Sequence, residues 1–141
     1  MPTAGERRAI CDASALTALL IDSGPAGGWA ADTVRGANLA APSLASWETA
    51  NIIRRHELAG LISADQGAQA HADLLDLEIE FWPYELLAAR SWQHRRNLSI
   101  YDASYVALAE LTRATLVTLD GRIARAPDLR CAVAAPDSSG A

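Results

Sequence analysis

Short apolar runs alternate along the chain with longer segments in which apolar residues recur every three or four positions. A short run predicts a strand, whereas the longer period predicts a helix with one buried face. On this basis we expect strands at residues 9–11, 38–41, 78–82, 115–119 and 129–133. We expect helices at residues 14–21, 29–34, 44–58, 63–77, 83–96, 99–112 and 121–126.

Three local patterns refine this outline. The glycine-rich stretch 24–28 predicts a break between the first two helices. In the third helix, the apolar residues Trp47, Ile52 and Leu58 are expected to face the core. Alternating polar and apolar residues at 78–82 predict a half-exposed strand at the edge of the sheet.

The alternation of strands and helices predicts an α/β fold, a parallel sheet covered by helices on both faces. The 141 residues, 50% of them hydrophobic, suffice for one domain with a buried core and exclude wholesale disorder. We assign a single domain to residues 1–141, with its core at about 9–134 and a frayed tail at 135–141. No apolar stretch approaches the ~20 residues that span a bilayer, so we expect a cytoplasmic protein without membrane contact.

Composition limits the partners and the metal ligands. The 17 acidic and 12 basic residues give a formal net charge of −5, whereas a duplex-DNA binder that works by bulk electrostatics would be basic. A nucleic-acid contact must therefore be local, or a metal ion must neutralise part of the acidic charge. The three histidines lack metal-ligand spacing, and we expect them at the surface: His56, His71 and His94. Cys11 and Cys131 lie in apolar segments and are expected to be core residues with reduced thiols.

Two aspartates, Asp12 and Asp120, follow directly on expected strands. The carboxyl ends of parallel strands meet at one edge of the sheet, where ligands bind. Asp102 and Glu48 lie near the starts of two helices and can reach the same edge. Four converging carboxylates repel one another unless a hard divalent cation such as Mg²⁺ lies between them. Such a site suits hydrolysis of a phosphodiester bond.

Helix capping is a simpler interpretation of each acid. Asp12 and Asp120 can cap the helices that follow them. Ser99 and Asp102 have the spacing of a capping box, and Glu48 is a favourable charge in a first turn. Capping does not explain why two of the acids directly follow apolar strands, so we keep both interpretations.

Four segments of the chain resemble the motifs of PIN-domain nucleases. Their order and spacing, and the length of the chain, are similar to those of the VapC toxins of type II toxin–antitoxin systems. The resemblance covers roughly residues 10–133. The four segments are ICDASAL at 10–16, SWETANIIRR at 46–55, YDASYVALAE at 101–110 and TLDGRIA at 118–124.

The resemblance implies a three-layer α/β/α fold with a central parallel sheet and an endoribonuclease that depends on Mg²⁺ or Mn²⁺. It implies that four acids form the catalytic metal site: Asp12, Glu48, Asp102 and Asp120. It implies supporting roles for three further residues: Ser14, Asn51 and Thr118. It also implies a homodimer that is neutralised by a cognate VapB-type antitoxin. Where Gly121 and Arg122 stand, some members carry a further acid, so the number of metal ions stays open.

On this hypothesis, water attacks an RNA phosphate and the 3′ oxygen departs. The RNA products then carry 5′-phosphate and 3′-hydroxyl ends. Four arginines near the motifs are candidates for contacting RNA phosphates: Arg54, Arg55, Arg95 and Arg96. Solvated helix-end charges are the alternative for them. Tyr101 and Trp92 are candidates for stacking on bases, with burial in the core as the alternative. The apolar segment from Ser14 to Trp29, together with Leu61 and Ile62, is a candidate groove for an antitoxin segment, with ordinary burial in the core as the alternative.

Two other functions were compared with this one. A haloacid-dehalogenase-like phosphatase needs a second aspartate two residues after the first, where this chain has Ser14, and a lysine, which the chain lacks. A non-catalytic PIN-like module that binds RNA or antitoxin is the alternative that stays open. All four acids are present, so the sequence shows no sign that catalysis has been lost.

Overall fold

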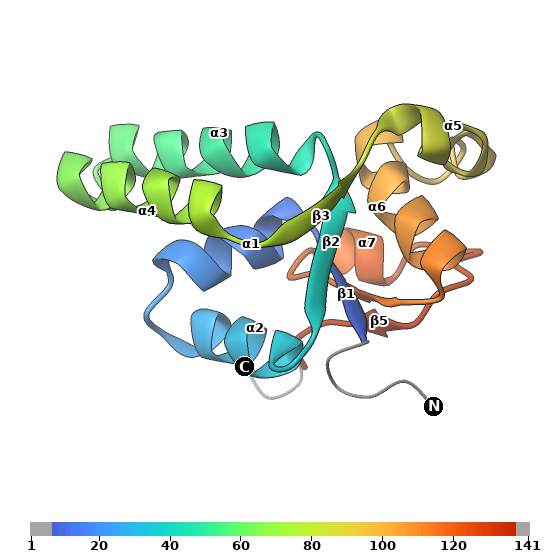
Figure 1. The fold of residues 1–141 in the computed structure, drawn as a ribbon, viewed down its shortest axis with the longest axis horizontal. Coiled ribbons are helices and arrows are strands. Elements are labelled where there is room, and N and C mark those ends of the chain that lie inside the picture. The colour runs from blue at the N-terminus through green and yellow to red at the C-terminus, as the bar shows by residue number, and fades with distance from the viewer. Residues whose placement is uncertain (1–6, 138–141) are drawn as a thin grey trace.

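A parallel β-sheet forms the centre of the molecule (Figure 1). The computed structural model describes residues 7–137, and within them the sheet has five strands in the order β3-β2-β1-β4-β5. Every neighbouring pair is parallel, as predicted. The strands are β1 (Arg8–Cys11), β2 (Asn38–Pro42), β3 (Ile79–Trp82), β4 (Thr115–Val117) and β5 (Val133–Ala134).

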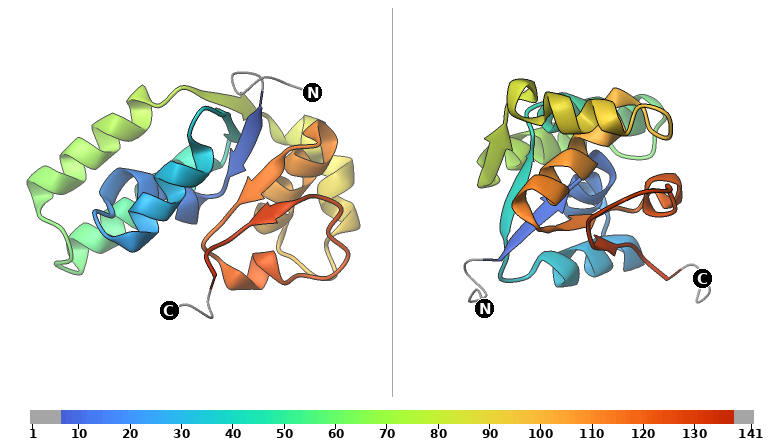
Figure 2. Two further views of the ribbon diagram at one scale, coloured as in Figure 1. Left: turned by 90° about the horizontal axis from the view of Figure 1, so that it is seen from below. Right: turned by 90° about the vertical axis from the view of Figure 1, so that its right-hand side faces the viewer.

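Helices cover both faces of this sheet, which confirms the expected three-layer α/β/α fold. In the left view of Figure 2, α1 to α4 lie on one side of the strands, and α5 and α6 lie on the other. The helices are α1 (Ala13–Ile21), α2 (Pro25–Val34), α3 (Ala45–Leu58), α4 (Ala64–Asp76), α5 (Tyr84–Gln93), α6 (Ile100–Thr112) and α7 (Gly121–Ala124). Between residues 7 and 137, none of them is long and apolar enough to cross a membrane.

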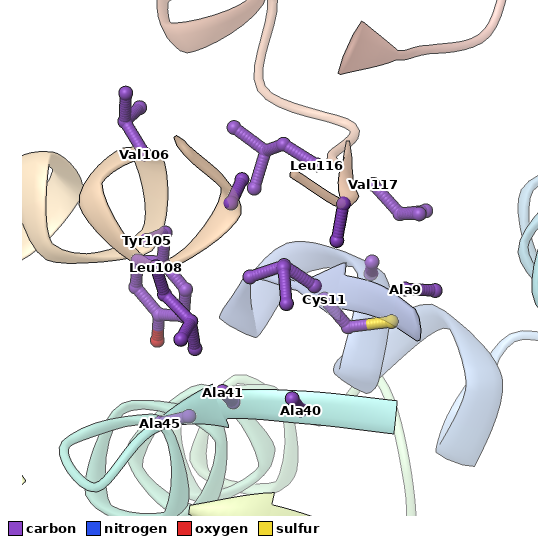
Figure 3. Close-up of a cluster of buried hydrophobic side chains, with 14 of the residues drawn as sticks. Ala9, Cys11, Ala40, Ala41, Ala45, Tyr105, Val106, Leu108, Leu116 and Val117 are labelled. Atoms are coloured by element: carbon purple, nitrogen blue, oxygen red, sulfur yellow. The ribbon is translucent and has the colours of Figure 1, made fainter. Parts of the chain in front are cut away.

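The core lies where α6 packs on the central strands. Eight consecutive residues of α6, from Ala103 to Glu110, are buried. Figure 3 shows Tyr105 and Leu108 of this helix facing the small residues of β2 and the start of α3. Because alanines at these positions allow a close approach, the packing fixes the first turn of α6 near the carboxyl ends of the strands.

The expected break between the first two helices is present but shorter than predicted, because only residues 22–24 separate α1 from α2. Helix α2 begins at Pro25, a residue favoured in a first helical turn, and not at Trp29. Gly27 is buried inside the helix, and a Cβ placed there would lie 1.8 Å from the backbone oxygen of Asp22. This glycine therefore permits close packing between α2 and the end of α1.

The predicted core face of α3 is wrong at two of its three positions. Trp47 is 73% exposed and Leu58 is 66% exposed, whereas Ile52 is half-buried. The buried residues of this helix are Ala45, Thr49 and Ile53. They recur at every fourth position, and two of them are small. The buried face of α3 therefore could not be predicted from the positions of its most hydrophobic residues.

The predicted edge strand is confirmed, since β3 lies at the margin of the sheet. The last strand is shorter and later than expected, because only residues 133 and 134 pair with β4. Cys11 is buried as expected, and Cys131 is half-buried at the border of the core. Residues 138–141 of the expected tail lie outside the described part of the chain.

The prediction that all three histidines lie at the surface is wrong for His94. This residue is 6% exposed, and its Nε2 lies 3.0 Å from Oε1 of Glu110. Glu110 also accepts a hydrogen bond from the backbone N–H of Arg130 at 2.7 Å and one from Arg90 at 3.4 Å. The buried carboxylate thus ties the end of α5 and the segment before β5 to α6.

Candidate active site

The four acids lie at the carboxyl edge of the sheet, each at the start of a helix. Asp12 follows β1 as the N-cap of α1, and Asp120 is the N-cap of α7 shortly after β4. These two strands are neighbours, so the two aspartates share one edge. Glu48 and Asp102 lie in the first turns of α3 and α6. A helix N-terminus carries partial positive charge, which favours carboxylates at all four positions.

Asp12 is the most deeply buried of the acids, with 4% of its surface exposed. Its Oδ1 accepts hydrogen bonds from Ser14 Oγ at 2.6 Å and from the backbone N–H of Ala15 at 2.9 Å. Its Oδ2 accepts a hydrogen bond from the hydroxyl of Thr118. Donors on both oxygens hold the carboxylate in a single orientation.

The hydroxyls of Ser14 and Thr118 also fix the loop that carries Asp120. Ser14 Oγ accepts a hydrogen bond from the N–H of Leu119 at 2.9 Å, and Thr118 Oγ1 accepts one from the N–H of Asp120 at 2.9 Å. Each hydroxyl therefore joins the Asp12 carboxylate to the backbone that follows β4. Capping and a place at the site coincide here, because Asp12 caps α1 and also lies at this edge.

Glu48 is held by Tyr105, a residue that the sequence did not single out. The Tyr105 hydroxyl donates a hydrogen bond to Glu48 Oε1 at 2.5 Å. Tyr105 is 1% exposed, and Figure 3 shows its oxygen directed toward the start of α3. Burial and the neighbouring Glu48 raise the pKa of Tyr105, so it stays a proton donor. The available signal was its position three residues after Asp102, on the same side of α6.

Asp102 and Asp120 differ in their hydrogen bonds. The backbone N–H of Asp102 donates to Ser99 Oγ at 3.1 Å, so Ser99 caps α6 and supplies one half of the expected capping box. Asp120 Oδ1 accepts from the N–H of Arg122 at 2.9 Å, and Oδ2 accepts from the Arg122 guanidinium at 2.8 Å. Arg122 thus supplies a positive charge at this edge, although 79% of its side chain is exposed.

The pKa values of three acids are raised. Burial is the main cause for Asp12, Glu48 and Asp102, and negative neighbours add to it: Asp120 raises the pKa of Asp12 and of Asp102, and Asp102 raises that of Glu48. The pKa of Asp120 is lowered by its hydrogen bond from Arg122. The four carboxylates therefore interact electrostatically, and the ion pair between Arg122 and Asp120 offsets only part of their negative charge.

A hard divalent cation fits this deficit, because its preferred ligands are carboxylate oxygens. Between residues 7 and 137, however, no three acidic, histidine or cysteine side chains are close enough together to form a complete metal site. Mg²⁺ commonly keeps several waters and uses only one or two carboxylates directly, so the donor set still suits it. Such an ion would compete with Arg122 for Asp120.

Two hollows adjoin the acids. An open cleft of about 520 Å³ is lined by Leu44, Trp47, Glu48, Asn51 and Tyr101. A smaller groove of about 250 Å³ lies between α1, α2 and α3, and its apolar lining includes Ala18, Ile21 and Ile52. The structure thus places Asn51 beside Glu48, on the outer face of α3.

All four arginines expected to contact RNA are exposed. Arg54 and Arg55 lie on α3 beyond Glu48, whereas Arg95 and Arg96 follow the end of α5. The guanidinium of Arg95 lies over the Trp92 ring, 5.0 Å from its centroid. Of the two proposed stacking residues, only Tyr101 lines the cleft beside the acids.

Comparisons with known proteins agree with this architecture. The family model of the PIN domain matches residues 9–129. Ribonuclease VapC12 of Mycobacterium tuberculosis is 34% identical over 116 residues, which are 82% of this chain and 89% of that protein. The structure of PAE2754 from Pyrobaculum aerophilum matches with a TM-score of 0.64 at 22% identity, over 94% of this chain and 92% of that one.

A member of the VapBC family of toxin–antitoxin systems, VapBC-5 of M. tuberculosis, has the same fold. It matches with a TM-score of 0.53 at 23% identity, over 91% of this chain and 96% of that one. The comparisons confirm the resemblance drawn from the four motifs, and with it the endoribonuclease class. The chain therefore belongs to the PIN domain family, with VapC ribonucleases among its relatives.

Proposed function

We propose that this chain is the toxin of a type II toxin–antitoxin system, a metal-dependent endoribonuclease whose catalytic metal site consists of Asp12, Glu48, Asp102 and Asp120. The observation that carries the proposal is the placement of four carboxylates, from four helix starts, along one sheet edge, where burial and negative neighbours raise the pKa values of three of them. In this proposal residues 1–141 form a single PIN domain with its core at about 9–134. The cytoplasmic location expected from the sequence stays a prediction.

Asp12, Asp102 and Asp120 would hold the ion, which we propose is Mg²⁺ or Mn²⁺. When bound, such an ion offsets negative charge on a phosphoryl oxygen and lowers the pKa of a water. Ser14 and Thr118 keep the Asp12 carboxylate oriented through their hydrogen bonds. To bind the ion, Asp120 would have to give up its side-chain hydrogen bond from Arg122.

Glu48 is suited to accept a proton from the attacking water. Tyr105 bonds to its Oε1, and Oε2 is then the oxygen that can face the water. Burial raises the pKa of Glu48, which brings it nearer to that of an effective general base. Attack on phosphorus with departure of the 3′ oxygen leaves 5′-phosphate and 3′-hydroxyl ends.

A VapB-type antitoxin is the second part of the proposal, and the apolar groove between α1, α2 and α3 is its binding site. The groove borders Ser14 and Leu119, so a segment bound there would reach the acidic edge. The toxin–antitoxin membership of VapBC-5 supports such a partner. We also propose a homodimer, supported by the exposed apolar residues Leu58 and Leu61 at the end of the α3–α4 hairpin.

The test is cleavage of end-labelled total RNA by purified, antitoxin-free chain with Mg²⁺ or Mn²⁺, beside an EDTA control. We expect discrete products that carry 5′-phosphates, lost in EDTA and in Asp12→Asn. Asp76→Asn, which changes an exposed aspartate on α4, is the matched control and should cleave normally. Products ending in 2′,3′-cyclic phosphate would contradict the mechanism. Absence of cleavage with both metals would favour the non-catalytic binding module.

A further inference from the structure

Two exposed aromatic side chains flank the acidic site. Trp47 on α3 is 73% exposed and Tyr101 on α6 is 64% exposed, so neither contributes its ring to the core. Each directly precedes an acid of the site, Glu48 and Asp102 respectively. Both line the open cleft of about 520 Å³. Large apolar surface left in water at such a place indicates a binding surface.

The outer face of α3 continues this surface away from the acids. Asn51 lies four residues after Trp47, and Arg54 and Arg55 lie three and four residues after Asn51. These spacings place all four on one side of the helix, and all are exposed. With a rise of about 1.5 Å per residue, Arg54 lies about 10 Å along the axis from Trp47. An aromatic ring, an amide and a guanidinium group therefore follow in sequence from the acidic edge.

The chemistry of the cleft selects a nucleobase over a phosphate. Glu48, and Asp102 next to Tyr101, repel phosphate, whereas aromatic rings stack on any base because every base has a π-face. The amide of Asn51 can donate and accept hydrogen bonds, as recognition of a base edge requires. The arginines farther along α3 can take the phosphate. A wholly apolar occupant would offer no polar partner to Asn51, or to the oxygen of Glu48 that Tyr105 does not bind.

We propose that the cleft between Trp47 and Tyr101 binds one unpaired base of the RNA beside the cleaved phosphate. Asn51 hydrogen-bonds to the edge of that base, and Arg54 or Arg55 contacts the adjoining phosphate. The inference rests on the proposed ribonuclease function and adds the residues that position its substrate. These are positioning residues, since none of them touches the reacting phosphorus.

The experiment measures RNA binding apart from cleavage. The probe is a single-stranded RNA oligonucleotide with one 2-aminopurine, whose fluorescence is quenched when it stacks, titrated against full-length chain in the Asp12→Asn background. We expect Trp47→Leu and Tyr101→Leu each to weaken binding by about 5- to 150-fold and to remove part of the quenching. Trp47→Phe keeps a ring and should recover most of both.

Leu111→Ala is the matched control, because Leu111 is an exposed apolar residue, 42% exposed, at the opposite end of the helix that carries Tyr101. Its RNA affinity should equal that of the parent. All the variants should keep the melting temperature of the parent, since the altered side chains lie on the surface. A Trp47→Leu variant that binds RNA as tightly as Leu111→Ala does would overturn the proposal.

Two further outcomes separate this inference from the proposed function. If unaltered chain cleaves RNA and both aromatic variants bind and cleave normally, the base site is wrong and the nuclease stands. If the chain neither binds nor cleaves RNA, both are wrong. Normal RNA binding by Trp47→Leu with loss of self-association in sedimentation would assign the cleft to a second copy of the chain and overturn the base site.

Discussion

Replacing Thr118 with valine removes two hydrogen bonds from the centre of the site with little change of shape. The Thr118 side chain is fully buried, donates to the Asp12 carboxylate and accepts from the N–H of Asp120. A hydrogen bond to a charged group contributes about 1.5–3 kcal/mol, and one between neutral groups about 0.5–1.5 kcal/mol. The added methyl regains about 1 kcal/mol. We expect Thr118→Val to lower the free energy of unfolding by about 1–3.5 kcal/mol at neutral pH.

The loss should depend on pH in a defined direction. Burial raises the pKa of Asp12, and the hydroxyls of Ser14 and Thr118 oppose the rise. Because the folded pKa lies above the unfolded one, the contribution of Asp12 to stability is fully present below the unfolded pKa and is lost as pH rises through the folded pKa. Removing the Thr118 donor raises the folded pKa further. The difference between variant and parent should therefore shrink as acid protonates Asp12.

Urea unfolding in EDTA, from neutral pH down to about pH 4, measures this difference without bound metal. Thr17→Val is the matched control, because Thr17 is buried and its hydroxyl donates to the Ala13 carbonyl at 2.7 Å, with no charged partner. It should cost less than about 1 kcal/mol at every pH. Equal losses in the two variants, or a Thr118→Val loss that does not change with pH, would refute the role assigned to the hydroxyl.

Four further substitutions give three separate expectations. Gly27→Ala should lower the free energy of unfolding by about 1–3 kcal/mol, because the added Cβ meets the backbone of Asp22. Gly28→Ala adds its Cβ in open space and should raise the free energy of unfolding by about 0.5–1 kcal/mol. Thermal unfolding measures both. Glu110→Gln should lower the free energy of unfolding by about 1–3 kcal/mol in urea unfolding, because it weakens the hydrogen bonds that the buried carboxylate accepts. Burial raises the pKa of Glu110, but these hydrogen bonds outweigh it and lower the pKa. The contribution of the carboxylate to stability is therefore lost as pH falls through the folded pKa. Arg122→Gln should raise the pKa of Asp120 and tighten Mg²⁺ binding by about two- to fivefold in calorimetry, because the ion no longer competes with the guanidinium.

Each of these expectations has a result that contradicts it. Equal melting temperatures for the two glycine variants would show that the α1–α2 contact yields without cost. A Glu110→Gln protein as stable as the parent would show that the buried carboxylate of Glu110 does not stabilise the fold. Unchanged or weaker Mg²⁺ binding by Arg122→Gln would mean that the arginine and the ion do not compete for one carboxylate.

The acids could be located from the sequence because their positions follow from local rules. Asp12 comes directly after β1, and Asp120 lies three residues after β4, which ends at Val117 and not at Leu119 as expected. The order of elements makes those strands parallel, so their ends share an edge. Glu48 and Asp102 open helices, which returns them to the same edge. Adjacency in the chain and the geometry of a parallel sheet were sufficient here. Their roles as metal ligands stay predictions.

Contacts between distant segments could not be located in this way. Tyr105 bonds to Glu48 and His94 to Glu110 through the packing of helices, which no local period encodes. Trp47 was misplaced because we took the largest apolar side chains to face the core, whereas the buried residues of α3 are Ala45, Thr49 and Ile53. The ring of Trp47, which the apolar pattern of the helix assigned to the interior, is one of the two that we now propose bind RNA.

The burial of eight consecutive residues in α6, from 103 to 110, leaves this stretch of helix without a solvent face. Truncation of any one of its larger residues to alanine lowers the free energy of unfolding by about 2–5 kcal/mol. That is a large share of the total for a domain, which is about 5–15 kcal/mol. Enlargement of its alanines forces the layers apart. In a genetic selection for survivors of toxin expression, loss-of-function substitutions should therefore accumulate along the whole of this stretch, and not only at the acids.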